Sequence, residues 1–340
     1  MEYKNLTLRD VAKAAGVSVS TVSRVLNEEK FTSEDVKKRV NEAIKKLKYS
    51  PDLNARNLRL GKTNVIGVVI PNISDYFFSR VVHAMTKFFR ENGKDIILFN
   101  TSNQEEVEEK EIKLAISKRV EGIVLATISK NVKPISTLIN HFGIPFVIID
   151  NKIKVRNVDF VLSDDENRAE KLINHLINVH NLKKIACISG PMDESSGFNK
   201  LLGYKNALNL NNIPINKNYI KIANWKKDLA YKYTEELINM DDRPEAIYCA
   251  NSNMLIGCLR YLNTTKIRIP EDMAVVTFDD DDFVSAMNPP ITSLKSIVSE
   301  MGAQAAQILL DRINGKRGEY KEIKLDSGIM IRRSCGCNYL

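Results

Sequence analysis

One stretch near the N-terminus, Leu6–Pro51, constrains the fold of this chain more than any other feature. Apolar residues recur at helical spacing from Leu8 to Ala15, and Thr7 directly before them can cap the first turn of a helix. Gly16 can take the left-handed conformation that ends a helix. A second short apolar-periodic segment, capped by Ser18, follows at once. The sequence therefore predicts two short helices joined by a tight glycine turn, the helix-turn-helix arrangement.

The outer face of the second predicted helix carries hydrogen-bonding side chains and no carboxylate: Ser18, Ser20, Thr21, Ser23 and Arg24. A helix that lies in the major groove of DNA needs such a face, because a carboxylate would meet the phosphates. A third helix, from about Ser33 to Leu47, supplies apolar residues that close a small core. The same periodicity also fits an ordinary three-helix cap with a solvated polar face, so by itself it leaves both interpretations open.

Charge is unevenly distributed along the chain. The whole sequence carries a net charge of +8, and residues 1–62 hold 14 Lys and Arg against 8 Asp and Glu. The remaining residues hold 36 basic against 34 acidic side chains. The N-terminal sixth of the chain therefore carries most of the excess, as expected if this part contacts phosphate and the rest does not.

The exact amino-acid sequences of several segments indicate a protein family more specifically than their apolar periodicity does. The sequence resembles the lactose/purine repressor (LacI/GalR) family of bacterial transcription regulators along nearly its whole length and in the same order. The matching segments are TLRDVAKAAGVSVSTVSRVLN, YSPDLNARNLRLGKT, IGVVIPNISDYFF, KRVEGIVLA, ISGP, RPEAIYCAN, RIPEDMAVVTFDD and NPPITSL. The resemblance implies a DNA-binding headpiece (residues 1–50), a hinge (51–62) and an effector-binding core (63–340).

The resemblance also implies which headpiece residues meet DNA. Val19 and Ser20 match positions that contact base edges, and Arg24, one turn further on, can hold a guanine with two hydrogen bonds. Contacts to phosphates are expected from Thr7, Ser18, Thr21, Ser23, Asn27 and Tyr49. Because one such helix reads only a few bases, a homodimer on a pseudo-palindromic double-stranded operator is implied.

The segment between headpiece and core is weakly apolar and contains two arginines. As an isolated helix it would be marginal, and a plain flexible linker is one interpretation. The family resemblance implies instead a hinge helix that folds only on DNA and enters the minor groove, with Leu58 as a wedge between base pairs. Asn54, Ala55 and Arg56 then lie on the groove-facing turn.

From residue 64 onward, apolar strands alternate with helices, which predicts parallel sheets covered on both faces. The expected fold class is an all-α helix-turn-helix headpiece plus an α/β core of two doubly wound parallel-sheet lobes, as in periplasmic binding proteins. By resemblance the chain crosses between lobes near Pro289 and Tyr320. The N-lobe is then expected over residues 63–161 and 291–320, and the C-lobe over 162–290 and 321–340.

In sheets of this kind, ligands bind outside the carboxyl ends of the strands. The family places aromatic side chains against the ligand at positions that match Phe77 and Trp225. Phe78 fits either a contact with the ligand or packing in the hydrophobic core. The polar candidates in the same loops are Asp75, Asp150, Ser196, Lys200, Asn251 and Asp279. Lys200 stands where the family usually has arginine, and Ser252 replaces a common aspartate, so the identity of the ligand stays open.

Catalytic and metal-binding patterns are missing from the sequence. The four histidines lie on predicted helices, and no phosphate-binding glycine loop follows a strand. Five cysteines indicate a reducing compartment. Cys335 and Cys337 form the only close pair, and with no further Cys or His nearby in the sequence we interpret it as incidental. We therefore expect no enzyme activity, no cofactor and no metal.

Together these patterns predict a cytoplasmic transcription regulator, a repressor of a catabolic operon, without signal peptide or membrane span. A small polar effector such as a sugar or sugar acid would bind between the core lobes and alter DNA affinity through the hinge. One alternative is a family regulator whose co-regulator is a phosphorylated carrier protein docked on the core, with a silent cleft. A solute-binding protein shares the core fold but would lack the headpiece.

Overall fold

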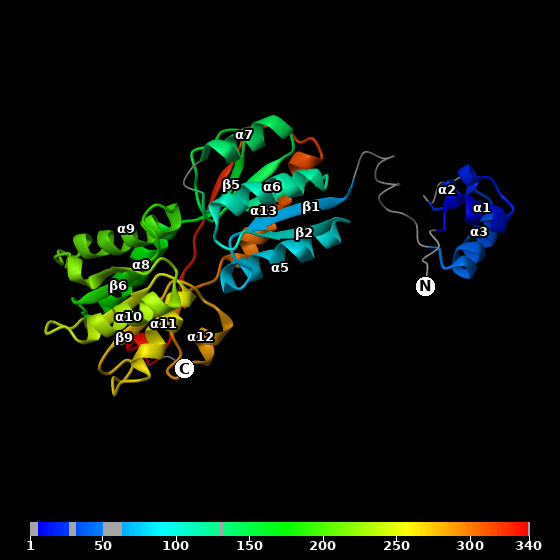
Figure 1. The fold of residues 1–340 in the computed structure, drawn as a ribbon. Helices are drawn as coiled ribbons and strands as arrows, with labels where there is room; N and C mark the ends of the chain where they lie inside the picture. Colours follow the sequence, from blue (N-terminus) through cyan, green and yellow to red (C-terminus); the bar gives the residue numbers. More distant parts are fainter. Residues whose placement is uncertain (1–5, 27–31, 50–62, 130–131, 339–340) are drawn as a thin grey trace. The chain divides into compact units, whose positions relative to one another are not determined.

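The computed structural model describes residues 6–26, 32–49, 63–129 and 132–338. The chain divides into two compact units, Met1–Thr63 and Asn64–Leu340, and each is described by itself (Figure 1). Every helix in the part of the chain that the structure describes is too short or too polar to span a lipid bilayer.

The N-terminal unit is a three-helix headpiece: α1 (Leu8–Ala15), α2 (Val19–Leu26) and α3 (Glu34–Leu47). The amide and hydroxyl of Thr7 both donate to Oδ2 of Asp10, each over 2.8 Å, and thereby fix the first turn of α1. Gly16 ends that helix with φ +64°, and Ser18 Oγ accepts from the amide of Thr21 at 3.1 Å to cap α2. The predicted helix-turn-helix is confirmed.

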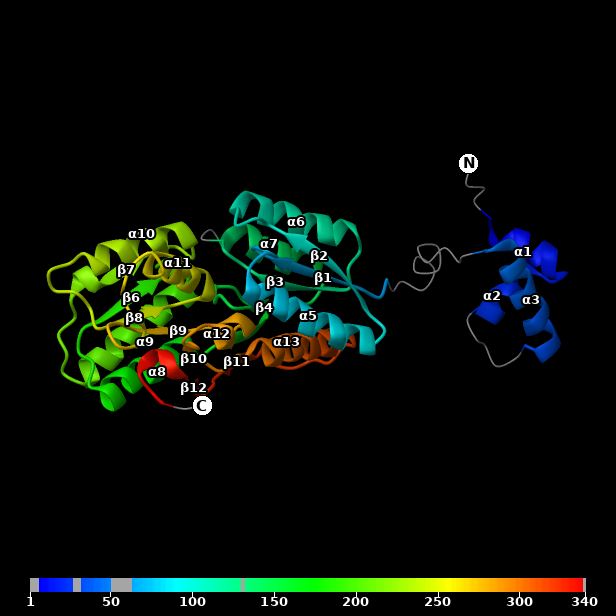
Figure 2. The ribbon, with the colours of Figure 1, turned by 90° about the horizontal axis from the view of Figure 1, so that it is seen from below.

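The first lobe of the core contains a parallel six-stranded sheet in the order β11-β5-β4-β3-β1-β2. Its strands are β1 (Val65–Ile70), β2 (Asp95–Asn100), β3 (Gly122–Ala126), β4 (Phe146–Ile149), β5 (Asp159–Ser163) and β11 (Glu322–Leu325). Helices α5 (Tyr76–Glu91) and α13 (Val298–Ile313) cover one face, and α6 (Glu105–Ser117) and α7 (Val132–Phe142) cover the other (Figure 2).

The second lobe contains a six-stranded sheet in the order β12-β10-β9-β8-β6-β7, in which only β12 runs antiparallel. Its strands are β6 (Ile185–Ser189), β7 (Ile220–Ile222), β8 (Ala246–Cys249), β9 (Ala274–Thr277), β10 (Thr292–Leu294) and β12 (Ile329–Met330). Helix α8 (Asp165–His180) packs on α9 (Ser195–Leu210), and α10 (Lys227–Ile238) packs on α11 (Ser252–Leu262). The short helix α12 (Asp282–Ala286) and the 3₁₀ turns η1 (Lys217–Tyr219) and η2 (Arg333–Cys335) complete the lobe.

The two doubly wound lobes confirm the predicted fold class, but five strands of two to five residues were not foreseen: β5, β7, β10, β11 and β12. Their pairing moves the crossings between lobes. β10 pairs with β9 in the second sheet, and β11 pairs with β5 in the first. The chain therefore crosses after Leu294 and after Leu325, a few residues later than the expected crossings near Pro289 and Tyr320.

Candidate functional site

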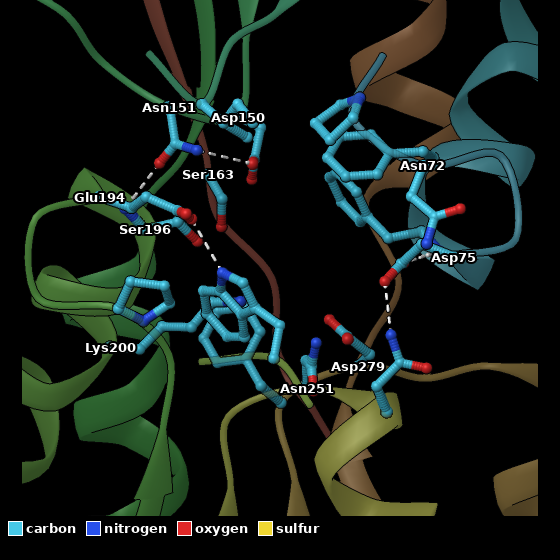
Figure 3. Close-up of a pocket in the computed structure, with 18 of the residues that line it drawn as sticks. Asn72, Asp75, Asp150, Asn151, Ser163, Glu194, Ser196, Lys200, Asn251 and Asp279 are labelled. Carbon is cyan, nitrogen blue, oxygen red and sulfur yellow. Dashed lines mark hydrogen bonds between the residues drawn. The ribbon is translucent and has the colours of Figure 1, made fainter. Parts of the chain in front are cut away.

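A cavity of about 740 Å³ lies between the two lobes of the core, at the carboxyl ends of strands from both sheets (Figure 3). In Figure 3, Lys200 and Asp75 face it from opposite sides. All nine residues predicted for the effector site line this cavity: Asp75, Phe77, Phe78, Asp150, Ser196, Lys200, Trp225, Asn251 and Asp279. The structure thus brings the predicted set together, because each residue follows a strand or begins a helix at the same edge.

Asp75 joins the two lobes across the cavity. It is the N-cap of α5, and its Oδ1 accepts from the amide of Phe77 at 2.9 Å. Its Oδ2 accepts from Nδ2 of Asn253 in the other lobe at 2.7 Å. Burial, and then the nearby charge of Asp279, raise the pKa of Asp75 to about 6. The carboxylate therefore caps a helix of one lobe and also forms a hydrogen bond to the other lobe, which requires the two lobes to be close together.

Two aromatic rings stand beside Asp75. Phe77 and Phe78 are partly buried, and their ring centroids lie 5.1 Å apart in an edge-to-face arrangement. Both rings line the cavity as an apolar wall, and both also pack against the hydrophobic core of the first lobe. Phe78 therefore has both of the roles that the sequence left open, ligand contact surface and core packing.

Asp150 follows β4 with a left-handed backbone, φ +68°. Its Oδ2 accepts from Nδ2 of Asn151 at 3.3 Å. Burial raises the pKa of Asp150 to about 8, although the positive charge of Lys200 acts against the increase. At neutral pH this carboxyl is therefore largely protonated and can donate a hydrogen bond into the cavity.

Lys200 is buried on α9 rather than reaching freely into the cavity. Its Nζ donates to the carbonyl oxygen of Ala250 at 3.2 Å. The same atom lies 4.0 Å from the ring centroid of Phe278 and 5.1 Å from that of Trp225. The lysine is thus a positive charge held by a carbonyl and two rings, without the two-pronged geometry of an arginine.

Trp225 is held rigidly. It and Asn224 both have positive φ, +59° and +51°, a strained backbone for residues with side chains. Its Nε1 donates to Oε2 of Glu194 at 2.8 Å. The indole also lies against Gly190, where an added Cβ would come within 2.2 Å of the ring. A flat aromatic surface is therefore fixed at the wall of the cavity.

The remaining predicted polar residues take part in hydrogen bonds between a main-chain amide and a side-chain oxygen. Oδ1 of Asn251 caps α11 by accepting from the amide of Met254 at 2.9 Å. The amide of Ser196 donates to Oδ1 of Asn151 at 3.0 Å, and Asp279 Oδ2 accepts from the amide of Ser252 at 3.1 Å. Ser252, where the family commonly has aspartate, thus supports Asp279 through its backbone and does not itself line the cavity.

Sequence reasoning missed several lining residues, above all Asp165 and Arg168 in the first turn of α8. The guanidinium of Arg168 donates to Ser163 Oγ at 2.7 Å and to the carbonyl oxygen of Lys295 at 3.1 Å. Burial lowers the pKa of Arg168 and raises that of Asp165. Both residues follow β5, and without that strand no sequence signal marked them as lying at a carboxyl end.

The lobes also touch at the edge of the cavity, through side chains of α5 and α12 that do not line it and through the lining residues Asp280 and Asp281. Arg80 on α5 donates to the carbonyl oxygen of Asp280 at 3.0 Å and to Oδ1 of Asp281 at 3.3 Å. The rings of Tyr76 and Phe283 lie 5.4 Å apart. These polar and aromatic contacts are of the kind that can break and reform when two lobes move.

In the headpiece, the structure describes Thr7 and the predicted contact residues of α2, and Val19 is 40% exposed. Ser18, Ser20 and Arg24 are also exposed, whereas Thr21 and Ser23 are half-buried. The hydroxyl of Ser18 lies 2.7 Å from that of Ser20 and 2.8 Å from that of Thr21. The Tyr49 ring is buried in the headpiece core, and its contact with a phosphate stays a prediction. The predicted contacts Asn27, Asn54, Ala55, Arg56 and Leu58 lie outside the described residues.

One expectation is wrong. The Cys335 and Cys337 pair is not isolated from other metal-binding side chains, because the fold places His175 and His180 of α8 beside it. The four side chains are distant in sequence but adjacent in space.

Comparisons with known proteins agree with this architecture. Residues 7–52 match the bacterial regulatory proteins of the lacI family, and residues 173–335 match a periplasmic binding protein-like domain. The chain is 32% identical to the HTH-type transcriptional repressor PurR of Vibrio atlanticus over 326 residues, 96% of this chain and 97% of that protein. It is 28% identical to PurR of Pasteurella multocida, with 96% and 98% covered.

Among solved structures, a transcriptional regulator CelR–cellobiose complex is 26% identical, with a TM-score of 0.74 over 97% of this chain and 99% of that one. The lac repressor dimer bound to operator and the anti-inducer ONPF shares the fold, with 24% identity and a TM-score of 0.88 over 98% and 99%. The headpiece, the two-lobed core and these full-length similarities together identify the chain as a DNA-binding transcriptional repressor that belongs to the lacI family of bacterial regulatory proteins.

Proposed function

We propose that this repressor controls genes for the use of a carbohydrate, and that its effector is a neutral saccharide bound in the cavity between the lobes. The observation that carries the proposal is the charge of the cavity wall. Among the described lining residues, nine carboxylates stand against four cations. The carboxylates are Asp75, Glu105, Asp150, Asp165, Asp193, Glu194, Asp279, Asp280 and Asp281, and the cations are Arg168, Lys200, Lys226 and Lys227.

Asp150 is largely protonated at neutral pH, but the other eight carboxyl groups still outnumber the four cations. An anionic ligand would meet this excess of like charge, so a neutral sugar is favoured over the sugar acid that the sequence left open. Carboxylate and amide oxygens accept hydrogen bonds from sugar hydroxyls, and Asp150 can donate one while it is protonated. The fixed indole of Trp225 offers a flat surface for the apolar face of a sugar ring. The volume lies within the range of small-molecule sites, and the cellobiose complex of a relative is consistent with this class.

On the DNA side we propose a homodimer that reads a pseudo-palindromic operator through α2. Val19, Ser20 and Arg24 would face base edges, and the hydroxyls of Ser18, Thr21 and Ser23 would contact phosphates. The dimeric lac repressor on its operator supports this arrangement. Contacts by Asn27 and by the hinge residues remain predictions.

We propose that the effector acts by changing the contacts between the lobes. A ligand held by residues of both lobes stabilises one relative position of the lobes. If the two headpieces of the dimer bind DNA best when the lobes take a different relative position, the ligand changes the affinity for DNA. The Asp75–Asn253 hydrogen bond at the cavity is the contact most directly exposed to such a change.

A thermal-shift screen against neutral sugars, sugar acids, sugar phosphates and nucleobases tests the effector class. We expect stabilisation by a neutral mono- or disaccharide, since a ligand that binds only the folded state raises the melting temperature. Trp225→Leu should abolish the shift, whereas Phe198→Leu, which changes an exposed aromatic of α9 outside the cavity, should keep it. Stabilisation by an anionic class alone, or by nucleobases alone, would overturn the proposal. A blank in every class would favour a protein co-regulator, such as a phosphorylated carrier, docked on the core.

A further inference from the structure

Four side chains with nitrogen and sulfur ligand atoms meet on the second lobe, away from the residues that line the cavity. His175 and His180 belong to the last part of α8, and Cys335 and Cys337 follow β12 near the C-terminal end of the chain. One ligand atom from each lies within 4.8 Å of every other. This is the only such group of three or more His, Cys, Asp or Glu among the described residues.

Three of the six distances between these ligand atoms match tetrahedral zinc coordination. Nε2 of His175 lies 3.4 Å from Sγ of Cys335 and 3.7 Å from Sγ of Cys337, and Nε2 of His180 lies 3.3 Å from Sγ of Cys337. Zinc bonds of about 2.3 Å to sulfur and about 2.0–2.1 Å to nitrogen, at tetrahedral angles, separate an S and an N ligand by about 3.5 Å. The three sulfur–nitrogen distances lie close to that value.

We propose that His175, His180, Cys335 and Cys337 bind one structural Zn²⁺ ion. Two thiolates and two neutral imidazoles form a closed Cys₂His₂ set, the donor type and number that zinc takes in structural sites. Two thiolates also balance the charge of the ion, so the complete site is neutral and suits its largely buried position. His175, Cys335 and Cys337 are buried, and His180 is half-buried.

The residues around the four side chains support the binding of a metal ion. The Thr292 hydroxyl donates to Cys335 Sγ at 3.2 Å, an outer contact of the kind that orients metal ligands. Gly336, between the two cysteines, has φ +104°, a conformation that residues with a side chain rarely adopt. A Cβ at this position would lie 3.2 Å from Nδ1 of His180. The glycine therefore lets the chain turn closely enough around His180 for both cysteines to face the histidines.

The ion would tie the C-terminal segment to α8. Arg332, three residues before Cys335, pairs with Asp280 at 2.7 Å, and Asp280 lines the cavity. Helix α8 itself supplies Asp165 and Arg168 to the same cavity from its other end. The metal would thus hold together the tail and the helix on which part of the cavity depends, while making no contact with the effector.

Metal content and cobalt spectroscopy on the full chain test the proposal. Protein produced with zinc in the medium and purified without chelators should contain a single zinc ion per chain. Cobalt added to the zinc-free protein should give the visible bands of tetrahedral, thiolate-bound Co²⁺. Cys337→Ser and His180→Ala should each lose most of the zinc and weaken these bands. Zinc should raise the melting temperature of the wild type but not of the variants.

Matched controls separate this site from adventitious binding. Cys258→Ala changes a buried cysteine of α11, and His141→Ala changes an exposed histidine of α7; both variants should keep the zinc. If Cys337→Ser fails to fold, His180→Ala and the cobalt spectrum of the wild type still decide. Zinc-free wild-type protein without cobalt bands, full retention of zinc by both variants, or a disulfide between Cys335 and Cys337 would each overturn the proposal. The proposal is independent of the effector class.

Discussion

Replacing Asp150 by asparagine tests whether the cavity holds a protonated carboxyl in the absence of effector. Burial raises the pKa of Asp150 from 3.8 to about 8. Between these values the folded protein keeps a proton that the unfolded chain has lost, so this residue lowers stability as the pH rises. Asparagine carries no such proton, has nearly the same shape, and tolerates the φ of +68° at this position. We therefore expect Asp150→Asn to be more stable than the wild type, by a margin that grows with pH.

The pH dependence of that margin follows from linkage. One proton difference changes the free energy of unfolding by about 1.4 kcal/mol per pH unit, so the margin would grow by about 3 kcal/mol between pH 5 and pH 7 if Asp150 were isolated from solvent. The side chain is half-buried at the cavity wall, and solvent in the cavity screens part of the effect. We expect an increase of about 1 to 2 kcal/mol over this interval.

Urea unfolding without effector, followed by the fluorescence of Trp225, measures this margin, because Trp225 is the only tryptophan and lies in the core. The difference between variant and wild type should be determined at several values between pH 5 and pH 8. Asp95→Asn, an exposed aspartate of the same lobe, is the control and should show a small difference. A margin for Asp150→Asn that stays constant with pH, or shrinks as the pH rises, would refute the reasoning.

Three further substitutions probe the headpiece and the cavity wall. Arg24→Ala should weaken operator binding by about 1–3 kcal/mol and relax base preference at one position of each half-site, as measured by selection from a randomised duplex library. Gly190→Ala should push the indole of Trp225 aside, since an added Cβ lies within 2.2 Å of it, and should weaken effector binding by calorimetry without lowering effector-free operator affinity. Val22→Ala, fully buried in the headpiece core, should destabilise the headpiece by about 1–3 kcal/mol and speed hydrogen exchange of α2, whereas exchange in the core should stay unchanged.

The sequence predicted the cavity residues well because topology does most of the work in a parallel sheet. Strands such as β1, β4 and β8 are continuous apolar runs, so their ends are visible in the sequence, and the residues after them must meet at one edge. Asp75, Asp150 and Asn251 follow directly from that rule. The sequence did not predict Asp165 and Arg168, because β5, the strand before them, begins with Asp159 and is not a continuous apolar run. In the structure the Asp159 carboxylate accepts two hydrogen bonds of 2.8 Å from Arg312.

Short edge strands escaped prediction for a related reason. β7 is a three-residue strand, Ile-Lys-Ile, and β12 has only two residues, so neither offers enough apolar periodicity to be recognised. Their position is decided by partners far along the chain, as when β10 pairs with both β9 and β12. Such tertiary pairing also set the crossings between the lobes, which the sequence located only to within a few residues.

The Cys/His cluster shows the limit of judging a metal site by spacing along the chain. His175 and Cys335 are separated by 160 residues, so no local motif contains both, and Cys-Gly-Cys alone lacks two ligands. The two histidines meet the cysteines only because of strand pairing in the fold. β12 runs antiparallel beside β10 and thereby returns the C-terminal segment to the second lobe, where α8 ends. His180 stands half-buried at the last position of α8, and Gly336 ends the 3₁₀ turn η2 with positive φ between two buried cysteines. The turn at Gly336 brings both cysteines to the two histidines, and this meeting of four nitrogen and sulfur ligand atoms is the physical reason for proposing that the pair is functional rather than incidental.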